Sequence, residues 1–238
     1  MSNPVNQSQE YPDNSDGRVL TIPVSDRAAF EDACARASTD EAVRLVVVVL
    51  SGEVSVEPGM PASIAALRIP VVSGMSGRID DRALELVLAV DVRVCDTNTT
   101  FAMSPASKAG NGQLPSDGGT QRLPRIVGPG LATDMLLSGR RITAEEALRA
   151  GLVTEICPAG ESTTRAQQLA RKIASHGKSA GRFTKEAVLK GADMPLEQSL
   201  RLEADLAILL HTDPERAEGI DAFNVRRKPD FRQEDGSQ

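Results

Sequence analysis

Apolar residues in the first half of the chain form short continuous runs, and between the runs they recur at helical spacing. β-branched runs ended by glycine are typical of strands buried on both faces of a parallel sheet. Four strands are predicted in this way, at 18–24, 43–52, 69–77 and 91–96. Helices are predicted at 26–39, where Asp26 is a candidate N-cap, and in the stretch after 77, while 53–62 is expected to be a loop. This alternation predicts a layered α/β fold with right-handed crossovers.

The pattern becomes helical after residue 119. A long loop rich in Gly, Pro and Ser precedes it at 104–119, and loops of this length are uncommon unless they serve a function or are disordered. Several helical segments end in glycine, as C-capped helices do, and 152–158 is a short predicted strand. The last third is predicted to be mostly amphipathic helix, which must bury its apolar faces against the core or against another subunit.

Composition narrows the class of protein. Aromatic residues make up 3% of the chain, Trp is absent and the net charge is −6. Nucleic-acid binders need a basic face, and those that bind single strands need aromatic platforms, so we expect no nucleic-acid partner. Cys34, Cys95 and Cys157 lie far apart with no CxxC motif, which predicts a reducing compartment, no disulfide frame and no metal site.

The N-terminal segment does not resemble a targeting signal. Residues 1–17 are polar and rich in Pro and Asn, with neither a basic region nor an apolar one, so we expect a disordered tail. The longest apolar run, at 45–50, is far too short to span a bilayer. We therefore expect a cytoplasmic protein with no membrane partner.

One acidic residue lies inside an apolar helical segment. Glu85 stands between Leu84 and Leu86, and Asp81 and Arg82 precede it on the same helical face. Residues three and four positions apart on a helix are neighbours. From these residues alone, an ion pair between Glu85 and Arg82 is the simplest interpretation.

The order of several segments resembles one known family. "GGTQRLPRIVG", "LLSGRRITAEEALRAGLVTEICP", "TKEAV" and "EGIDAFNVRRKPDF" follow one another as in the second half of the enoyl-CoA hydratase/isomerase (crotonase) superfamily. "IPVVSGMSG", a helix and "DVRV" resemble its centre, so the resemblance covers 43–52 and 69–231. It implies an α/β fold with a crotonase-like ββα spiral core, which we place at 18–190. A C-terminal helical region that drives trimerisation would follow at 191–238, giving a homotrimer or a dimer of trimers.

The resemblance also implies a thioester site. In this family two backbone N–H groups form an oxyanion hole for the thioester carbonyl of an acyl-CoA, and hydratases add two glutamates that activate water. A gapless match places Glu85 at the first catalytic glutamate. The oxyanion donor maps to the backbone N–H of Arg82, where the family has glycines that tolerate positive φ.

Other family positions are changed. The second glutamate falls on Pro105 or Ala106, and the nearest acid, Asp117, is either a second catalytic acid or simply an N-cap or turn residue. Much of the segment that carries the first oxyanion donor is missing. With Gly59 as its glycine, the donor falls on Pro58, which has no N–H.

Two basic or glycine-rich segments complete the candidate site. Arg226, Arg227 and Lys228 match the family's basic segment near the CoA phosphates, although a solvated charge run near the terminus is a slightly better interpretation of these residues. Gly118-Gly119-Thr120 is predicted to open a helix whose N-terminus can face an anion, but the resemblance implies a structural role, since in the family this segment packs the active-site loop.

These observations lead to two hypotheses about function. The first is an enoyl-CoA hydratase/isomerase-like protein that acts on or binds an acyl-CoA or carrier thioester through a compromised site, with no cofactor beyond that ligand. One carboxylate cannot readily hold water and move both protons, so standard two-glutamate hydration is disfavoured. The alternative is a non-catalytic accessory protein of this fold that binds a ligand or a partner enzyme.

Overall fold

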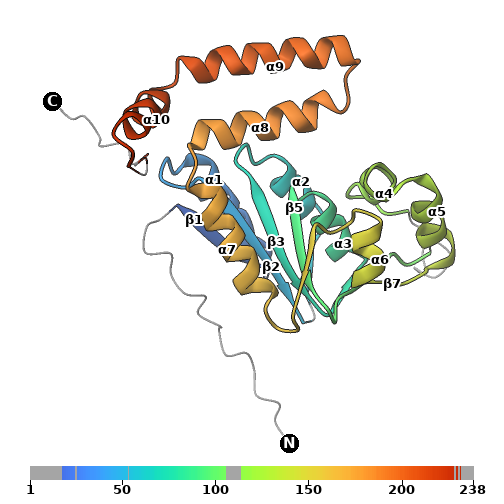
Figure 1. Ribbon diagram of the computed structural model, residues 1–238. Helices are drawn as coiled ribbons and strands as arrows, with labels where there is room; N and C mark the ends of the chain where they lie inside the picture. Colours follow the sequence, from blue (N-terminus) through green and yellow to red (C-terminus); the bar gives the residue numbers. More distant parts are fainter. Residues whose placement is uncertain are drawn as a thin grey trace, which may run out of the picture.

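The computed structural model describes residues 18–24, 26–52, 54–105, 114–227, 229 and 231 of the 238. Its central element is a five-stranded parallel sheet in the order β1-β2-β3-β5-β8 (Figure 1). The strands are β1 (Val19–Pro23), β2 (Leu45–Ser51), β3 (Val71–Ser76), β5 (Val92–Asp96) and β8 (Glu155–Cys157). The strands predicted from the apolar runs are all confirmed, and the α/β class with them.

Ten helices occur among the described residues. Those of the core are α1 (Arg27–Thr39), α2 (Met60–Ala65), α3 (Asp81–Leu88), α4 (Gly119–Val127), α5 (Pro129–Ser138), α6 (Ala144–Arg149) and α7 (Ser162–Ala174). The last three are α8 (Lys178–Gly191), α9 (Leu196–His211) and α10 (Pro214–Asn224). Asp26 caps α1 as predicted, accepting a hydrogen bond from the N–H of Ala29.

Both faces of the sheet are covered, and β2 shows how. Leu45, Val47 and Val49 point to one face and pack with alanines of α7. The intervening residues, Val46, Val48 and Leu50, belong to the larger core formed with α1, α2 and α3. Burial on both faces explains why β2 is a continuous apolar run rather than an alternating one.

The prediction of a loop at 53–62 is wrong at its C-terminal end, where α2 begins. Met60 and Ile64 lie one helical turn apart and are both fully buried, so packing against the core stabilises a helix too short to be recognised by periodicity.

A second, smaller sheet supports the N-terminus of α3. It consists of β4 (Arg78–Asp80), β6 (Thr100–Ala102) and β7 (Ile142–Thr143), in the order β4-β6-β7. The successions β3-β4-α3 and β5-β6-α4 are two strand–strand–helix repeats, as the family resemblance implied.

The helices α8, α9 and α10 lie at one end of the molecule, beyond the sheet (Figure 1). The predicted domain boundary at 190/191 falls at the end of α8, which packs against α9. The predicted tail, residues 1–17, lies outside the described residues. No described helix is both long and apolar enough to cross a membrane.

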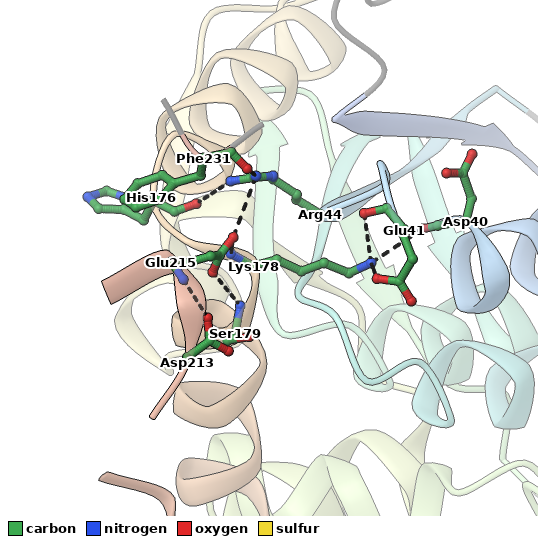
Figure 2. A network of polar contacts seen from close by, with 9 residues as sticks. All are labelled: Asp40, Glu41, Arg44, His176, Lys178, Ser179, Asp213, Glu215 and Phe231. Atoms are coloured by element: carbon green, nitrogen blue, oxygen red, sulfur yellow. Dashed lines mark hydrogen bonds and ion pairs between the residues drawn. The ribbon is translucent and has the colours of Figure 1, made fainter. Parts of the chain in front are cut away.

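A buried ion pair joins these helices to the core (Figure 2). Arg44, which directly precedes β2, donates hydrogen bonds to the carbonyls of His176 and Phe231, and its guanidinium lies 3.5 Å from Glu215 Oε1. Glu215 accepts the N–H groups of Lys178 and Ser179 at 3.0 and 3.1 Å, so this residue of α10 caps α8. Side-chain exposure is only 8% for Arg44 and 12% for Glu215.

We expect Glu215→Ala to lower the free energy of unfolding by about 3–5 kcal/mol, because it removes one charge of a nearly buried ion pair and the acceptor of the Lys178 and Ser179 N–H groups. Equilibrium denaturation in urea measures the effect. The matched control is Glu41→Ala, since Glu41 is 88% exposed in its ion pair with Lys178. Its loss should stay within about 1 kcal/mol. Equal losses of unfolding free energy in the two variants would show that the buried ion pair contributes no more to stability than the exposed one.

Candidate active site

Glu85 is held by backbone amides rather than by an arginine. The N–H groups of Asp117 and Gly119 donate to the same oxygen, Glu85 Oε1, at 2.8 and 2.9 Å. The residue is 2% exposed, and no hydrogen bond to Oε2 is found within the described part of the chain. The predicted pair with Arg82 is wrong, since the Arg82 guanidinium pairs with Asp117 instead.

The N-terminus of α4 supplies one of these amides. Gly118 has φ +108, and a Cβ added to Gly119 would lie 3.1 Å from Glu85 Oε1. Glycine therefore permits the close approach of the carboxylate to the start of this helix. The anion predicted to face this N-terminus is the side chain of Glu85 itself.

Asp117 does not cap α4, whose N-cap is Gly118. Its Oδ1 accepts the N–H of Gly59 at 3.1 Å, and its Oδ2 is buried without a hydrogen bond to any described group. The guanidinium of Arg82 lies nearby, with Nε 3.8 Å from Oδ2. Asp117 thus links the starts of α2, α3 and α4. The N–H of Gly59, next to Pro58, is directed at this carboxylate, and the absence of the oxyanion donor mapped to Pro58 stays a prediction.

The start of α3 has a positive φ, a conformation that favours glycine, at a residue that is not glycine. Asp81 has φ +46, a left-handed conformation that costs an ordinary residue about 1–2 kcal/mol and that Asp tolerates better than most. Its carboxylate accepts the N–H and the Oγ–H of Ser104 at 2.5 and 2.9 Å. We expected the missing glycine to matter at Arg82, but the left-handed residue is Asp81, one position earlier.

A pocket of about 220 Å³ opens at these residues. It is lined by Asp81, Arg82, Glu85, Met103, Ser104, Leu114, Pro115 and Ser116. Pro105, one of two positions aligned with the second glutamate, is buried beside Gly139 and does not line the pocket. The other, Ala106, lies outside the described residues. Of the predicted acids, Glu85 lines the pocket, whereas Asp117 does not line it and pairs with Arg82.

The basic segment is not brought to this pocket within one chain. Arg226 is exposed with φ +54, and Arg227 forms an ion pair with Glu218. Lys228 lies outside the described residues. Arg226 and Arg227 follow α10, at the opposite end of the molecule from α3 and α4 (Figure 1). Their predicted role at CoA phosphates stays a prediction.

Two further classes of site find no support in the described part of the chain. It contains no group of three or more His, Cys, Asp or Glu residues suited to a metal ion. Its three cysteines are free and buried. Burial raises the pKa of Cys34 to about 11 and that of Cys95 to about 12, so both remain protonated thiols at neutral pH.

Comparisons with known proteins agree with the geometry. A family profile described as enoyl-CoA hydratase/isomerase matches residues 60–234. The 2,3-dehydroadipyl-CoA hydratase of Escherichia coli is 37% identical over 175 residues, which are 74% of this chain and 68% of that protein. The crotonyl-CoA hydratase of Syntrophomonas wolfei is 30% identical over 85% of each chain. A solved enoyl-CoA hydratase from Bacillus anthracis superposes with a TM-score of 0.82 and 26% identity, covering 92% of this chain and 97% of that one.

An ion pair beside the pocket gives a pH-dependent prediction. Arg141 donates to both carboxylate oxygens of Asp80 at 2.7 and 2.8 Å. Burial raises the pKa of Asp80, but the hydrogen bonds from Arg141 and Arg78 outweigh it and hold the pKa below its ordinary value. A lowered folded-state pKa stabilises the fold above the unfolded-state pKa, about 3.9, and this contribution is lost as pH falls through the folded-state pKa.

We therefore expect Arg141→Met to be less stable than the wild type near neutral pH, with the difference shrinking as the pH is lowered below about 4. Urea midpoints measured across that range test this. Arg125→Met is the control, because Arg125 and its partner Asp193 are both largely exposed. A stability difference at Arg141 that does not change with pH would contradict the assignment.

Proposed function

Because the chain belongs to the enoyl-CoA hydratase/isomerase family, we propose that it binds a short acyl-CoA thioester and moves a proton next to the thioester carbonyl. The observation that carries the proposal is Glu85, a carboxylate fixed by two amides through one oxygen on the wall of the pocket. The relatives named as hydratases of dehydroadipyl-CoA and crotonyl-CoA support a thioester as the ligand.

The size of the pocket limits what enters it. Pockets that enclose a drug-sized ligand measure about 300–1000 Å³, and this one measures about 220 Å³. We infer that the acyl group and the thioester occupy it, while the remainder of CoA lies outside. The N–H of Arg82, the second residue of α3, has no acceptor within its helix and serves as an oxyanion donor in this proposal.

The distribution of carboxylates favours a proton shift over hydration. Asp81 is engaged by Ser104, and Asp117 does not line the pocket, which leaves Glu85 to exchange protons. One carboxylate can remove a proton from one carbon and return it to another. Hydration needs water activation and proton delivery together. We therefore propose isomerisation of a 3-enoyl to a 2-enoyl thioester as the reaction.

We expect Glu85→Gln to lower the turnover of 3-butenoyl-CoA to crotonyl-CoA by about 100-fold or more, since general acid–base groups contribute about 10²–10⁴-fold. The amide oxygen of glutamine can still accept both N–H groups, so the fold should be retained. The absorbance of the conjugated thioester reports the rate, and denaturant midpoints report stability.

Asp117→Asn separates the two candidate acids. Asparagine keeps an oxygen for the N–H of Gly59, so we expect less than a tenfold loss of turnover. A loss equal to that of Glu85→Gln would instead identify Asp117 as the second acid. If the wild type binds acyl-CoA without turnover, the non-catalytic accessory function is favoured. Full activity of Glu85→Gln would refute the proposed chemistry.

We further propose that the protein self-associates through α8, α9 and α10, as a trimer or a dimer of trimers. Of the 16 residues of α9 only Leu206 is buried, and α8 has no buried residue. Large exposed hydrophobic side chains gather on these helices and the turns beside them: Val188, Leu189, Met194, Leu196, Leu200, Ile208, Leu209, Ile220, Phe223 and Val225. Helices with so little internal packing need a partner surface.

Light scattering coupled to size-exclusion chromatography tests the assembly. We expect Ile208→Glu to reduce the molecular mass of the particle, because a charge replaces an apolar contact. Leu137→Glu is the matched control, since Leu137 is 75% exposed on α5, outside the three helices. It should leave the mass unchanged. A monomeric wild type would refute the proposed association.

A further inference from the structure

The first turn of α3 is held by an unusual contact. Asp81 is one of two non-glycine residues with positive φ in the described part of the chain. Its two carboxylate oxygens accept the N–H and the Oγ–H of Ser104, which follows β6. The contact therefore ties the start of the helix to a separate strand. Asp81 and Ser104 both line the pocket.

A second contact keeps the helix N-terminus free of a side-chain cap. Asp80 is the N-cap of α3, a position at which an aspartate commonly accepts a hydrogen bond from the first turn. Here it makes no such bond, and its carboxylate pairs with Arg141 and Arg78 instead. The amides of the first turn, including that of Arg82, thus have no capping side chain from Asp80, and Arg82 lines the pocket.

The orientation of the Arg82 N–H depends on the peptide that joins it to Asp81. Glycine at position 81 would adopt the observed φ but would leave this peptide free to rotate, because nothing would tie residue 81 to β6. The Asp81 carboxylate removes that freedom through two hydrogen bonds of its own. Asp81 thus adopts the strained left-handed conformation and also fixes the orientation of the peptide that joins it to Arg82.

We propose that Asp81 and Ser104 form a clamp that orients the Arg82 N–H toward a bound thioester carbonyl. The inference rests on the proposed function and adds two positioning residues to it. In this role they touch no reacting atom. They act through the backbone of α3, by keeping a donor aligned with an oxygen whose charge grows during proton abstraction.

Asp81→Gly tests the clamp, because strain and positioning predict different effects. Glycine relieves the left-handed conformation, and this offsets the loss of the two exposed hydrogen bonds to Ser104, so the urea midpoint should change little. Loss of the clamp should lower kcat and kcat/KM by about tenfold or more, since the interaction strengthens in the transition state. Asp81→Asn, which keeps an acceptor for Ser104, should recover kcat to within about threefold of the wild type.

Ser104→Ala removes the hydroxyl and leaves the N–H bond, so its loss of kcat should be smaller than that of Asp81→Gly. The double variant should be no slower than Asp81→Gly alone, as expected for two residues of one unit. Ser138→Ala is the matched control. Ser138 donates to the carboxylate of Asp134 at 2.9 Å in the same type of pair, but on the exposed face of α5. It should leave the rate unchanged.

Binding measurements separate this inference from the proposed reaction. Isothermal titration with acetoacetyl-CoA and with CoA alone measures how the clamp affects binding affinity, without turnover. We expect Asp81→Gly to weaken the affinity for acetoacetyl-CoA by about tenfold and to leave the affinity for CoA unchanged. Only acetoacetyl-CoA has a thioester carbonyl that the Arg82 N–H could bind. Equal affinity of both proteins for acetoacetyl-CoA, or full kcat in Asp81→Gly, would overturn the clamp. A wild type that binds acetoacetyl-CoA through the clamp but turns nothing over would overturn the proposed reaction alone.

Discussion

The hydrogen bonds from Asp117 and Gly119 to Glu85 are the interaction on which the rest of the site depends. A carboxylate buried among the apolar residues of α3 would be costly without donors. The two amides satisfy one oxygen and join α3 to the segment that opens α4. That junction in turn places Asp117 against Gly59 and Arg82, so the three helix starts around the pocket are held by one set of polar contacts.

Much of the fold could be predicted because burial leaves a clear trace in the sequence. A strand covered on both faces, such as β2, must be apolar throughout, and this is visible as a run. The two-residue strand β7 and the six-residue helix α2 have no period to detect, and packing alone stabilises them. Segment order, rather than periodicity, was what predicted the family.

The site was predicted in part, and the missing part is contact between distant residues. The position of Glu85 followed from the family resemblance, but its partners lie 32 and 34 residues away and are backbone amides. Helical spacing suggested Arg82 as the partner of Glu85, because spacing identifies only residues that are near in the sequence. The positive φ of Asp81 was likewise assigned to the wrong residue, since the sequence does not reveal which peptide of a changed turn retains the glycine geometry.

The contacts of Arg44 also constrain the order in which the chain can fold. Arg44 is synthesised early and is nearly buried, yet one of its acceptors lies 132 residues later and another 187 residues later. During translation the first strands of the sheet therefore emerge long before these acceptors of Arg44. The sheet can form while the guanidinium is still hydrated, and the contacts described for Arg44 are complete only when the segments at His176, Glu215 and Phe231 are in place. Packing at the start of β2 and docking of the last helices are thus coupled through one side chain.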